Sequence, residues 1–184
     1  MSDGPKTILL GVTGSIAAYK AADIASALTK AGHSVHAVLT EEATHYVTPF
    51  LLQNLTRNHV TVRLRDEAPG RPPHIEIAER AHLALVAPAT ANLIAKHALG
   101  IADDALTTIL LATRAPMLFA PAMNGNMWLH PAIQAHVATL KLRGVSFIGP
   151  DTGMLACGYE GIGRLWDPAG IVARAIEILA ASPA

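Results

Sequence analysis

The sequence predicts a three-layer α/β fold in which helices cover both faces of a mostly parallel sheet. Short aliphatic runs alternate with longer segments of helical periodicity along the 184 residues. Most of the short runs are apolar throughout, which is typical of parallel strands that are buried on both faces. Because 51% of the residues are hydrophobic and 15% are charged, the chain can bury one sizeable core, and we expect a single domain over residues 1–184.

Five segments are expected to be buried strands of a sheet with about five or six strands. They are Thr7–Val12, Val35–Leu39, Leu83–Ala87, Met117–Ala120 and Val145–Ile148. An apolar stripe from Ile16 to Ala31 predicts the first helix, and Gly32 is a candidate for its C-cap. Further helices are expected near residues 44–55, 75–80, 92–99, 105–112, 131–143 and 169–179, and the proline-rich segment 65–73 is expected to be an exposed loop.

Charge and composition narrow the classes of partner. The formal net charge is zero, so nothing favours electrostatic capture of nucleic acid or of an anionic membrane. No apolar run reaches the roughly 18 residues of a membrane span, and the N-terminal residues lack the features of a signal peptide. We therefore expect a cytoplasmic protein without a nucleic-acid or membrane partner. The nine histidines show no convincing ligand spacing, so we predict no metal site.

Polar or glycine-containing segments follow four of the expected strands, and parallel strands place such segments at one edge of the sheet. They are Gly11–Lys20, Thr40–Glu42, Pro88–Asn92 and Pro121–Trp128. Gly14 and Ser15 at a helix start can hold a phosphate through backbone N–H groups, although their spacing matches neither the dinucleotide fingerprint nor the P-loop. Together the four segments could surround a flat ligand with polar edges. The alternatives are a glycine turn that serves only the connection, and simple helix N-caps at Thr90 and Asn126.

Two residues are candidates for proton transfer. Cys157 is the only cysteine, so it forms no internal disulfide, and it lies in a glycine-rich segment that we expect to be a loop. Either a reactive thiol or a small buried hydrophobic residue explains it. His74 opens the helix expected at 75–80, where the helix dipole disfavours the imidazolium, so a neutral imidazole could act as a base near neutral pH.

Five segments, taken together, resemble the flavin-dependent cysteine decarboxylases, above all the branch that decarboxylates phosphopantothenoylcysteine in coenzyme A biosynthesis. They are Gly14–Lys20, His74–Glu76, Pro88–Asn92, Pro121–Asn124 and Ala156–Gly158. The resemblance runs from about Lys6 to Ile178. It implies a flavodoxin-like fold, bound FMN as cofactor, and a homotrimer with active sites at subunit interfaces. It leaves open whether the trimers assemble further.

The resemblance also implies roles for individual residues. His74 matches the active-site base, Asn124 matches the asparagine that binds the substrate carboxylate, and Cys157 matches the proton donor on a loop that closes over the substrate. Met127, Ala156 and Gly158 would contact the substrate beside them. The residues implied to line the FMN are Gly14, Ser15, Ile16, Thr40, Glu42, Thr90, Ala91, Asn92, Leu93 and Ala122.

The implied reaction is the FMN-dependent decarboxylation of 4'-phosphopantothenoylcysteine to 4'-phosphopantetheine. Oxidation at Cβ gives a thioaldehyde, whose C=S group takes up the electrons released with carbon dioxide, and return of the hydride makes the cycle redox-neutral. Two features depart from the family pattern. Leu165 stands where the family commonly has methionine after Gly163-Arg164, and no synthetase domain follows the decarboxylase before Ala184. We therefore expect either that a separate synthetase makes the substrate or that the substrate is a different one.

Three alternatives to this function stay open. A peptidyl-cysteine decarboxylase, which modifies the C-terminal cysteine of a peptide, also fits Met127-Trp128, whereas the segment around Cys157 favours the coenzyme A branch. A flavin-bound regulatory subunit would be expected to carry long acidic extensions. A flavin prenyltransferase shares the fold more distantly and would not require His74 and Cys157 together.

Overall fold

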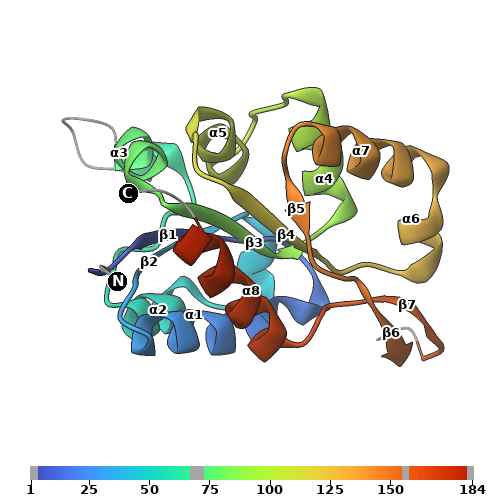
Figure 1. The fold of residues 1–184 in the computed structure, drawn as a ribbon, viewed down its shortest axis with the longest axis horizontal. Helices are drawn as coiled ribbons and strands as arrows, with labels where there is room; N and C mark the ends of the chain where they lie inside the picture. The colour runs from blue at the N-terminus through green and yellow to red at the C-terminus, as the bar shows by residue number, and fades with distance from the viewer. Residues whose placement is uncertain (1–3, 67–72, 155–157, 182–184) are drawn as a thin grey trace.

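The computed structural model describes residues 4–66, 73–154 and 158–181 and confirms the expected α/β architecture (Figure 1). The main sheet has the strand order β2-β1-β3-β4-β5, and all four pairings in it are parallel. This order is that of a flavodoxin-like fold. The strands are β1 (Thr7–Val12), β2 (Ser34–Leu39), β3 (Leu83–Ala89), β4 (Met117–Pro121) and β5 (Ser146–Phe147).

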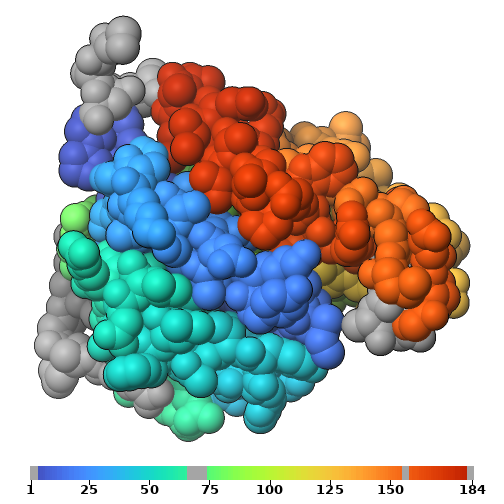
Figure 2. All heavy atoms as spheres, turned by 90° about the horizontal axis from the view of Figure 1, so that it is seen from below, coloured from blue at the N-terminus to red at the C-terminus, as the bar shows by residue number. Residues whose placement is uncertain are grey.

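Helices form a layer on each face of the sheet (Figure 1). Figure 2 shows one layer from outside, with α1 in blue, α2 in teal and α8 in red. This layer consists of α1 (Ala21–Lys30), α2 (Pro49–Thr56) and α8 (Pro168–Ala181). The opposite layer consists of α3 (Pro73–Arg80), α4 (Ala91–Leu99), α5 (Ala105–Ala112) and α7 (Pro131–Leu142). No helix in the described part of the chain is long and apolar enough to cross a membrane.

Strand β1 separates two hydrophobic cores. Ile8 and Leu10 point into the core under α1 and α8, whereas Leu9 points into the core under α4 and α5. Every residue of β1 is buried. The strand therefore needs apolar side chains on both faces, which explains why its sequence does not alternate.

The first expected helix forms in two parts. Its first turn is a 3₁₀ helix, η1 (Ile16–Lys20), and α1 continues from Ala21. Gly32 follows the C-cap with a φ of +91°, and its N–H donates to the carbonyl of Thr29. The N–H of His33 donates to the carbonyl of Leu28, so the helix ends in the paired bonds that a left-handed glycine permits.

The single helix expected near residues 44–55 is wrong. The chain instead forms a short 3₁₀ helix, η2 (Glu42–His45), and then α2, which begins at Pro49. The hydroxyl of Thr48 accepts the N–H of Leu51 at 3.2 Å and caps α2. A residue that precedes proline disfavours the helical conformation, so Pro49 can begin a helix but separates it from the turn before.

The glycine-rich segment near Cys157, expected as a loop, contains a β-hairpin. Strand β6 (Asp151–Met154) pairs antiparallel with β7 (Glu160–Arg164). The hairpin lies next to α6 (Gly125–Leu129), a short helix that we did not expect (Figure 1). A further 3₁₀ helix, η3 (Leu64–Asp66), begins near the start of the segment expected as an exposed loop.

Candidate functional site

The carboxyl ends of β1 and β3 lie side by side, at the point where the strand order reverses. Open parallel sheets bind ligands at this switch point. The Thr13 hydroxyl joins the two strand ends, because it donates to the carbonyl of Pro88 at 2.7 Å and accepts the N–H of Thr90 at 3.0 Å. Thr13 is only 1% exposed. Sequence reasoning gave it no role, although a threonine at the end of a buried strand was the available signal.

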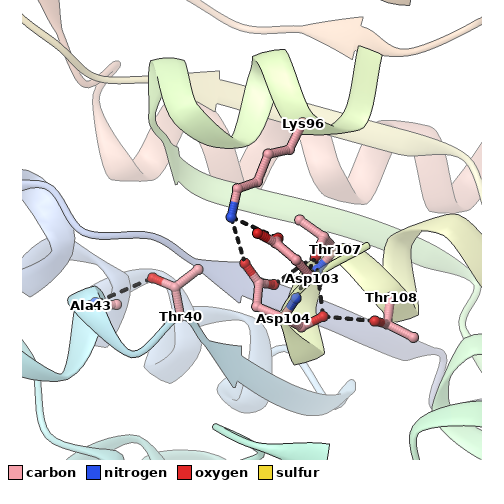
Figure 3. Close-up of polar contacts among 7 residues, drawn as sticks. All are labelled: Thr40, Ala43, Lys96, Asp103, Asp104, Thr107 and Thr108. Carbon is pink, nitrogen blue, oxygen red and sulfur yellow. Dashed lines mark hydrogen bonds and ion pairs between the residues drawn. The ribbon is translucent and has the colours of Figure 1, made fainter. Parts of the chain in front are cut away.

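The turn after β1 comes close to the segment after β2. A Cβ atom built on Gly14 would lie 2.2 Å from Cγ of Glu42, so only glycine fits beside that side chain. Ser15 begins η1, and its Oγ accepts the N–H of Ala17 at 3.3 Å. Thr40 Oγ1 accepts the N–H of Ala43 at 3.2 Å (Figure 3). The turn after β1, which is predicted to bind a cofactor, therefore packs against the segment that follows β2.

A cleft of about 730 Å³ lies at this edge, between the turn after β1, α4 and the start of α5. We call it the α4–α5 cleft, and its lining includes Gly14, Thr40, Glu42, Asn92, Lys96 and Asp104. Lys96 reaches across it, with Nζ 2.7 Å from Oδ1 of Asp103 and 3.5 Å from Oδ2 of Asp104 (Figure 3). The hydrogen bond to Asp103 raises the pKa of Lys96 and lowers the pKa of Asp103, so both groups are charged at neutral pH.

Asp104 is fixed by a second set of contacts. Its Oδ1 accepts the N–H of Thr107 at 2.8 Å, and the hydroxyl of Thr107 accepts the N–H of Asp104 at 3.1 Å. This capping box sets the start of α5 (Figure 3). The Lys96 contacts therefore tie α4 to the capped end of α5 on one wall of the cleft.

A second, smaller cavity of about 370 Å³ lies beside the segment that follows β4. We call it the Asn124 cavity, and its lining includes Ser15, Ile16, Lys20, Ala122, Asn124 and Arg164. Asn124 begins α6, and its Oδ1 accepts the N–H of Asn126 at 2.8 Å. The N-cap of this helix is therefore Asn124, and the alternative of a cap at Asn126 is wrong.

The β6–β7 hairpin packs directly on the Asn124 segment. The N–H of Met123 donates to the carbonyl of Gly163 at 3.0 Å. Gly163 has a φ of +132°, and a Cβ atom on it would lie 2.1 Å from the carbonyl oxygen of Met123. Gly125 is also required to be small, because its Cβ would lie 2.8 Å from the carbonyl oxygen of Ile162.

The other residues implied to bind cofactor lie around α4. Thr90 takes the N-cap position of α4, but its side chain makes no capping bond. Ala91 is 7% exposed and Leu93 is 2% exposed, and Leu93 packs in the core under α4 and α5. For these two residues the backbone, rather than the side chain, is the available contact.

The predicted substrate and proton-transfer residues that the structure describes do not all line one cavity. Met127 is 49% exposed on α6, and Gly158 is exposed with a φ of +87°. Ala156 and Cys157 lie outside the described residues. His74 is half-buried on α3, and it lines neither the α4–α5 cleft nor the Asn124 cavity as these are formed by the described residues. The predicted base and the predicted carboxylate-binding residue thus do not share a cavity within this chain.

Comparison with known proteins gives a consistent result. A family model described as Flavoprotein matches residues 1–179. The chain is 48% identical over 168 residues to the coenzyme A biosynthesis bifunctional protein CoaBC of Bacillus subtilis. That alignment covers 91% of this chain and 41% of the relative, so the chain spans about two fifths of the length of the curated relative that it matches.

Solved structures match over nearly the whole chain. One is a PPC decarboxylase with a cysteine-to-serine change, complexed with pantothenoylaminoethenethiol. It superimposes with a TM-score of 0.85 at 29% identity, covering 97% of this chain and 100% of that one. The FMN-dependent cysteine decarboxylase SpaF superimposes with a TM-score of 0.83 at 31% identity, covering 96% of this chain and 98% of that one.

Proposed function

The chain belongs to the Flavoprotein family, and from this premise we propose that it binds FMN and decarboxylates 4'-phosphopantothenoylcysteine to 4'-phosphopantetheine. The observation that carries the proposal is the Asn124 cavity, in which Asn124 lies with Ser15 and Ala122 at the switch point of the sheet. The likeness to CoaBC and to PPC decarboxylase supports this substrate over a peptide.

The residues at the switch point fit a flavin nucleotide. The α4–α5 cleft, at about 730 Å³, lies within the roughly 300–1,000 Å³ of small-ligand sites. Gly14 lets the turn after β1 approach Glu42 closely, and Ser15 and Thr40 bring hydroxyl groups to the same edge. The carboxylates of Glu42 and Asp103 offer acceptors for ligand hydroxyl or N–H groups.

Bound FMN would supply the acceptor and donor of the hydride that leaves and returns to the substrate Cβ. The chain's own residues would orient the substrate and move protons. Asn124 would donate from its side-chain amide to the substrate carboxylate, while its Oδ1 keeps the cap of α6. His74 would accept a proton as the substrate is activated, and Cys157 would protonate the enethiolate as the hydride returns.

We further propose a homotrimer in which neighbouring subunits share each active site. His74 lines neither the α4–α5 cleft nor the Asn124 cavity as the described residues form them, which supports a site that a second copy completes. Large apolar side chains are exposed near the Asn124 cavity, which favours burial against another subunit. They are Ile16 at 61%, Tyr19 at 59% and Met154 at 66% exposure. A cytoplasmic location stays a prediction.

The test combines cofactor, substrate and product. Purified protein should show a flavin absorbance band and should turn over 4'-phosphopantothenoylcysteine faster than a peptide that ends in cysteine. Cys157→Ser should release or retain an enethiol that lacks two hydrogen atoms of the normal product, because the final proton donor is lost. Absence of a flavin band after FMN addition would refute the proposal, and faster turnover of the peptide would favour the peptidyl-cysteine alternative.

A further inference from the structure

We propose that Arg164 binds the phosphate group of the substrate at the rim of the Asn124 cavity. The inference deepens the proposed function and rests on it for the identity of the ligand. The Asn124 cavity and the α4–α5 cleft differ in the charged side chains that line them. Lys20 and Arg164 line the Asn124 cavity, and no aspartate or glutamate is among its described lining residues. The lining of the α4–α5 cleft includes four carboxylates, those of Glu41, Glu42, Asp103 and Asp104, against three cationic side chains, those of Arg63, Arg65 and Lys96, so its described lining is slightly acidic whereas that of the Asn124 cavity is basic. An anionic group is therefore better accommodated in the Asn124 cavity.

The guanidinium of Arg164 is held from two sides. Its Nη2 donates to Oδ2 of Asp151, which lies across the hairpin on β6. Its flat face lies against Gly153, where an added Cβ atom would come within 2.8 Å of both Cζ and Nη1. Glycine at this position leaves the space that the guanidinium occupies. The bond from Arg164 also lowers the pKa of Asp151, so this carboxylate stays ionised at neutral pH.

Arg164 retains unused hydrogen-bonding capacity. A guanidinium has five N–H donors, and within the described residues Asp151 is its only hydrogen-bond partner. The side chain is 46% exposed and lines the cavity that also contains Asn124. A held guanidinium with further donors facing a ligand space is suited to bidentate recognition of an oxyanion.

The chemistry of the reaction favours the phosphate over the carboxylate as the partner of Arg164. A guanidinium paired with the carboxylate would stabilise the charged ground state more than the transition state, in which that charge disperses into carbon dioxide and the substrate. Such a contact would slow the reaction. The phosphate does not change during catalysis, so its binding energy is kept in the ground state and in the transition state alike. The neutral amide of Asn124 suits the carboxylate, and the cation suits the phosphate.

The assignment can be tested without turnover by measuring how the FMN-loaded protein binds the product, 4'-phosphopantetheine, and the same compound without its phosphate, pantetheine. Isothermal titration should show that wild type binds 4'-phosphopantetheine more tightly than pantetheine. Arg164→Met should weaken 4'-phosphopantetheine binding by at least about ten-fold and change pantetheine binding by less than about two-fold. Arg164→Lys should lose less, because it keeps the charge but not the fork. The matched control is Arg174→Met on α8, which removes an arginine of similar exposure, 48%, that also pairs with a carboxylate.

The outcomes separate the inference from the proposed function. Equal losses for both compounds in Arg164→Met would mean that Arg164 only positions the hairpin, and would overturn the phosphate assignment. No loss for either compound would overturn it as well. A wild type that prefers the phosphorylated compound through Arg164, yet fails to decarboxylate 4'-phosphopantothenoylcysteine, would refute the proposed reaction and leave the phosphate site standing.

Discussion

The backbone N–H of Met123 donates to the carbonyl of Gly163 over 3.0 Å, and this bond fixes the β6–β7 hairpin against the start of α6. Asn124 follows Met123, and Arg164 follows Gly163. The two side chains that we assign to the carboxylate and the phosphate are thus each one residue from the same backbone contact. The geometry of the Asn124 cavity therefore depends on how closely the backbone at Met123 approaches the backbone at Gly163.

Gly163→Ala should separate the hairpin from the Asn124 segment. The new Cβ would lie 2.1 Å from the carbonyl oxygen of Met123, and alanine would have to adopt a φ of +132°. We expect a loss of about 1–3 kcal/mol in the free energy of unfolding from the backbone conformation, and more from the clash. Decarboxylation should fall sharply, and FMN affinity should fall less, because the lining of the α4–α5 cleft does not include the hairpin, whereas Ser15, Ile16 and Ala122 share the Asn124 cavity with Gly163.

Gly144→Ala is the matched control for this change. Gly144 also has a positive φ, +90°, but nothing lies within 4 Å of its added Cβ. We expect it to lose about 1 kcal/mol in unfolding free energy and to keep full activity. Denaturant unfolding and turnover of both variants check the comparison. Equal loss of activity in the two variants would contradict a specific role for the Met123–Gly163 contact.

Thr13→Val should weaken both the fold and the binding of FMN. The substitution leaves the Pro88 carbonyl and the Thr90 N–H without the Thr13 hydroxyl, at the edge where we place the cofactor. Loss of buried hydrogen-bond partners costs about 1–3 kcal/mol. Thr13→Ser retains the hydroxyl and should keep FMN affinity. Fluorescence titration with FMN and denaturant unfolding measure the two effects separately.

Thr113→Val controls for stability alone. The Thr113 hydroxyl donates to the carbonyl of Ala78 at 2.7 Å and accepts the N–H of Ala115 at 3.2 Å, which is the same double contact at a distant position before β4. We expect a similar loss of stability and unchanged FMN affinity. If Thr113→Val weakened FMN binding as much as Thr13→Val, the effect would reflect stability rather than the switch point.

The sequence could predict the sheet and its ligand edge because both follow from local patterns. Strands such as β1 and β3 are buried on both faces, so their apolar runs are visible, and the polar residues Thr40 and Thr90 directly follow β2 and β3. The hairpin could not be predicted in this way. Its strands are glycine-rich and partly exposed, and what fixes them is the long-range contact of Gly163 with Met123.

Other parts of the site depend on tertiary contacts, on the exact start of a short helix or on subunit assembly. Local sequence patterns do not reveal these. Lys96 and Asp103 meet only because the loop between α4 and α5 turns back on itself. The choice between Asn124 and Asn126 as N-cap depends on where a five-residue helix begins, and local sequence leaves that open. The position of His74 relative to Asn124 is a question of subunit assembly, and no periodicity within the chain encodes it.

Mixed oligomers test the proposal that subunits share a site. Asn124→Asp keeps an N-cap for α6 but places a negative charge next to the substrate carboxylate, and His74→Asn removes the proposed base. Each variant alone should be inactive. When the two are co-expressed, random mixing should restore about a quarter of the wild-type sites, because a site then needs one intact residue from each of two chains.

Co-expression of Asn124→Asp with Gly163→Ala provides the control for complementation. Both substitutions damage the same cavity of one chain, so every cavity carries one defect and activity should stay absent. Purified hetero-oligomers, assayed for carbon dioxide release, distinguish the cases. Lack of activity in the mixture of His74→Asn and Asn124→Asp would contradict a shared site.

The contact between Lys96 and Asp103 should give the protein a distinctive pH dependence of stability. The pKa of Asp103 is lowered from 3.8 by its hydrogen bond to Lys96, so the carboxylate stabilises the fold above that pH, and the contribution is lost as pH falls through the lowered pKa. The pKa of Lys96 is raised from 10.5, so its contribution is present below that pH and is lost as pH rises through the raised pKa.

A double-mutant cycle with Lys96→Met and Asp103→Asn isolates this contribution from other charges. Denaturant unfolding of the four proteins should give a favourable coupling that is constant between about pH 5 and pH 9 and that shrinks towards both extremes. Asp104 also accepts from Lys96, at 3.5 Å, so Lys96→Met alone should destabilise the protein more than Asp103→Asn alone. A coupling that stayed constant down to the lowest pH at which the protein is folded would contradict an ionised pair. The salt dependence of the coupling is a second test. Added salt should weaken the coupling, because the Asp103 side chain is 57% exposed.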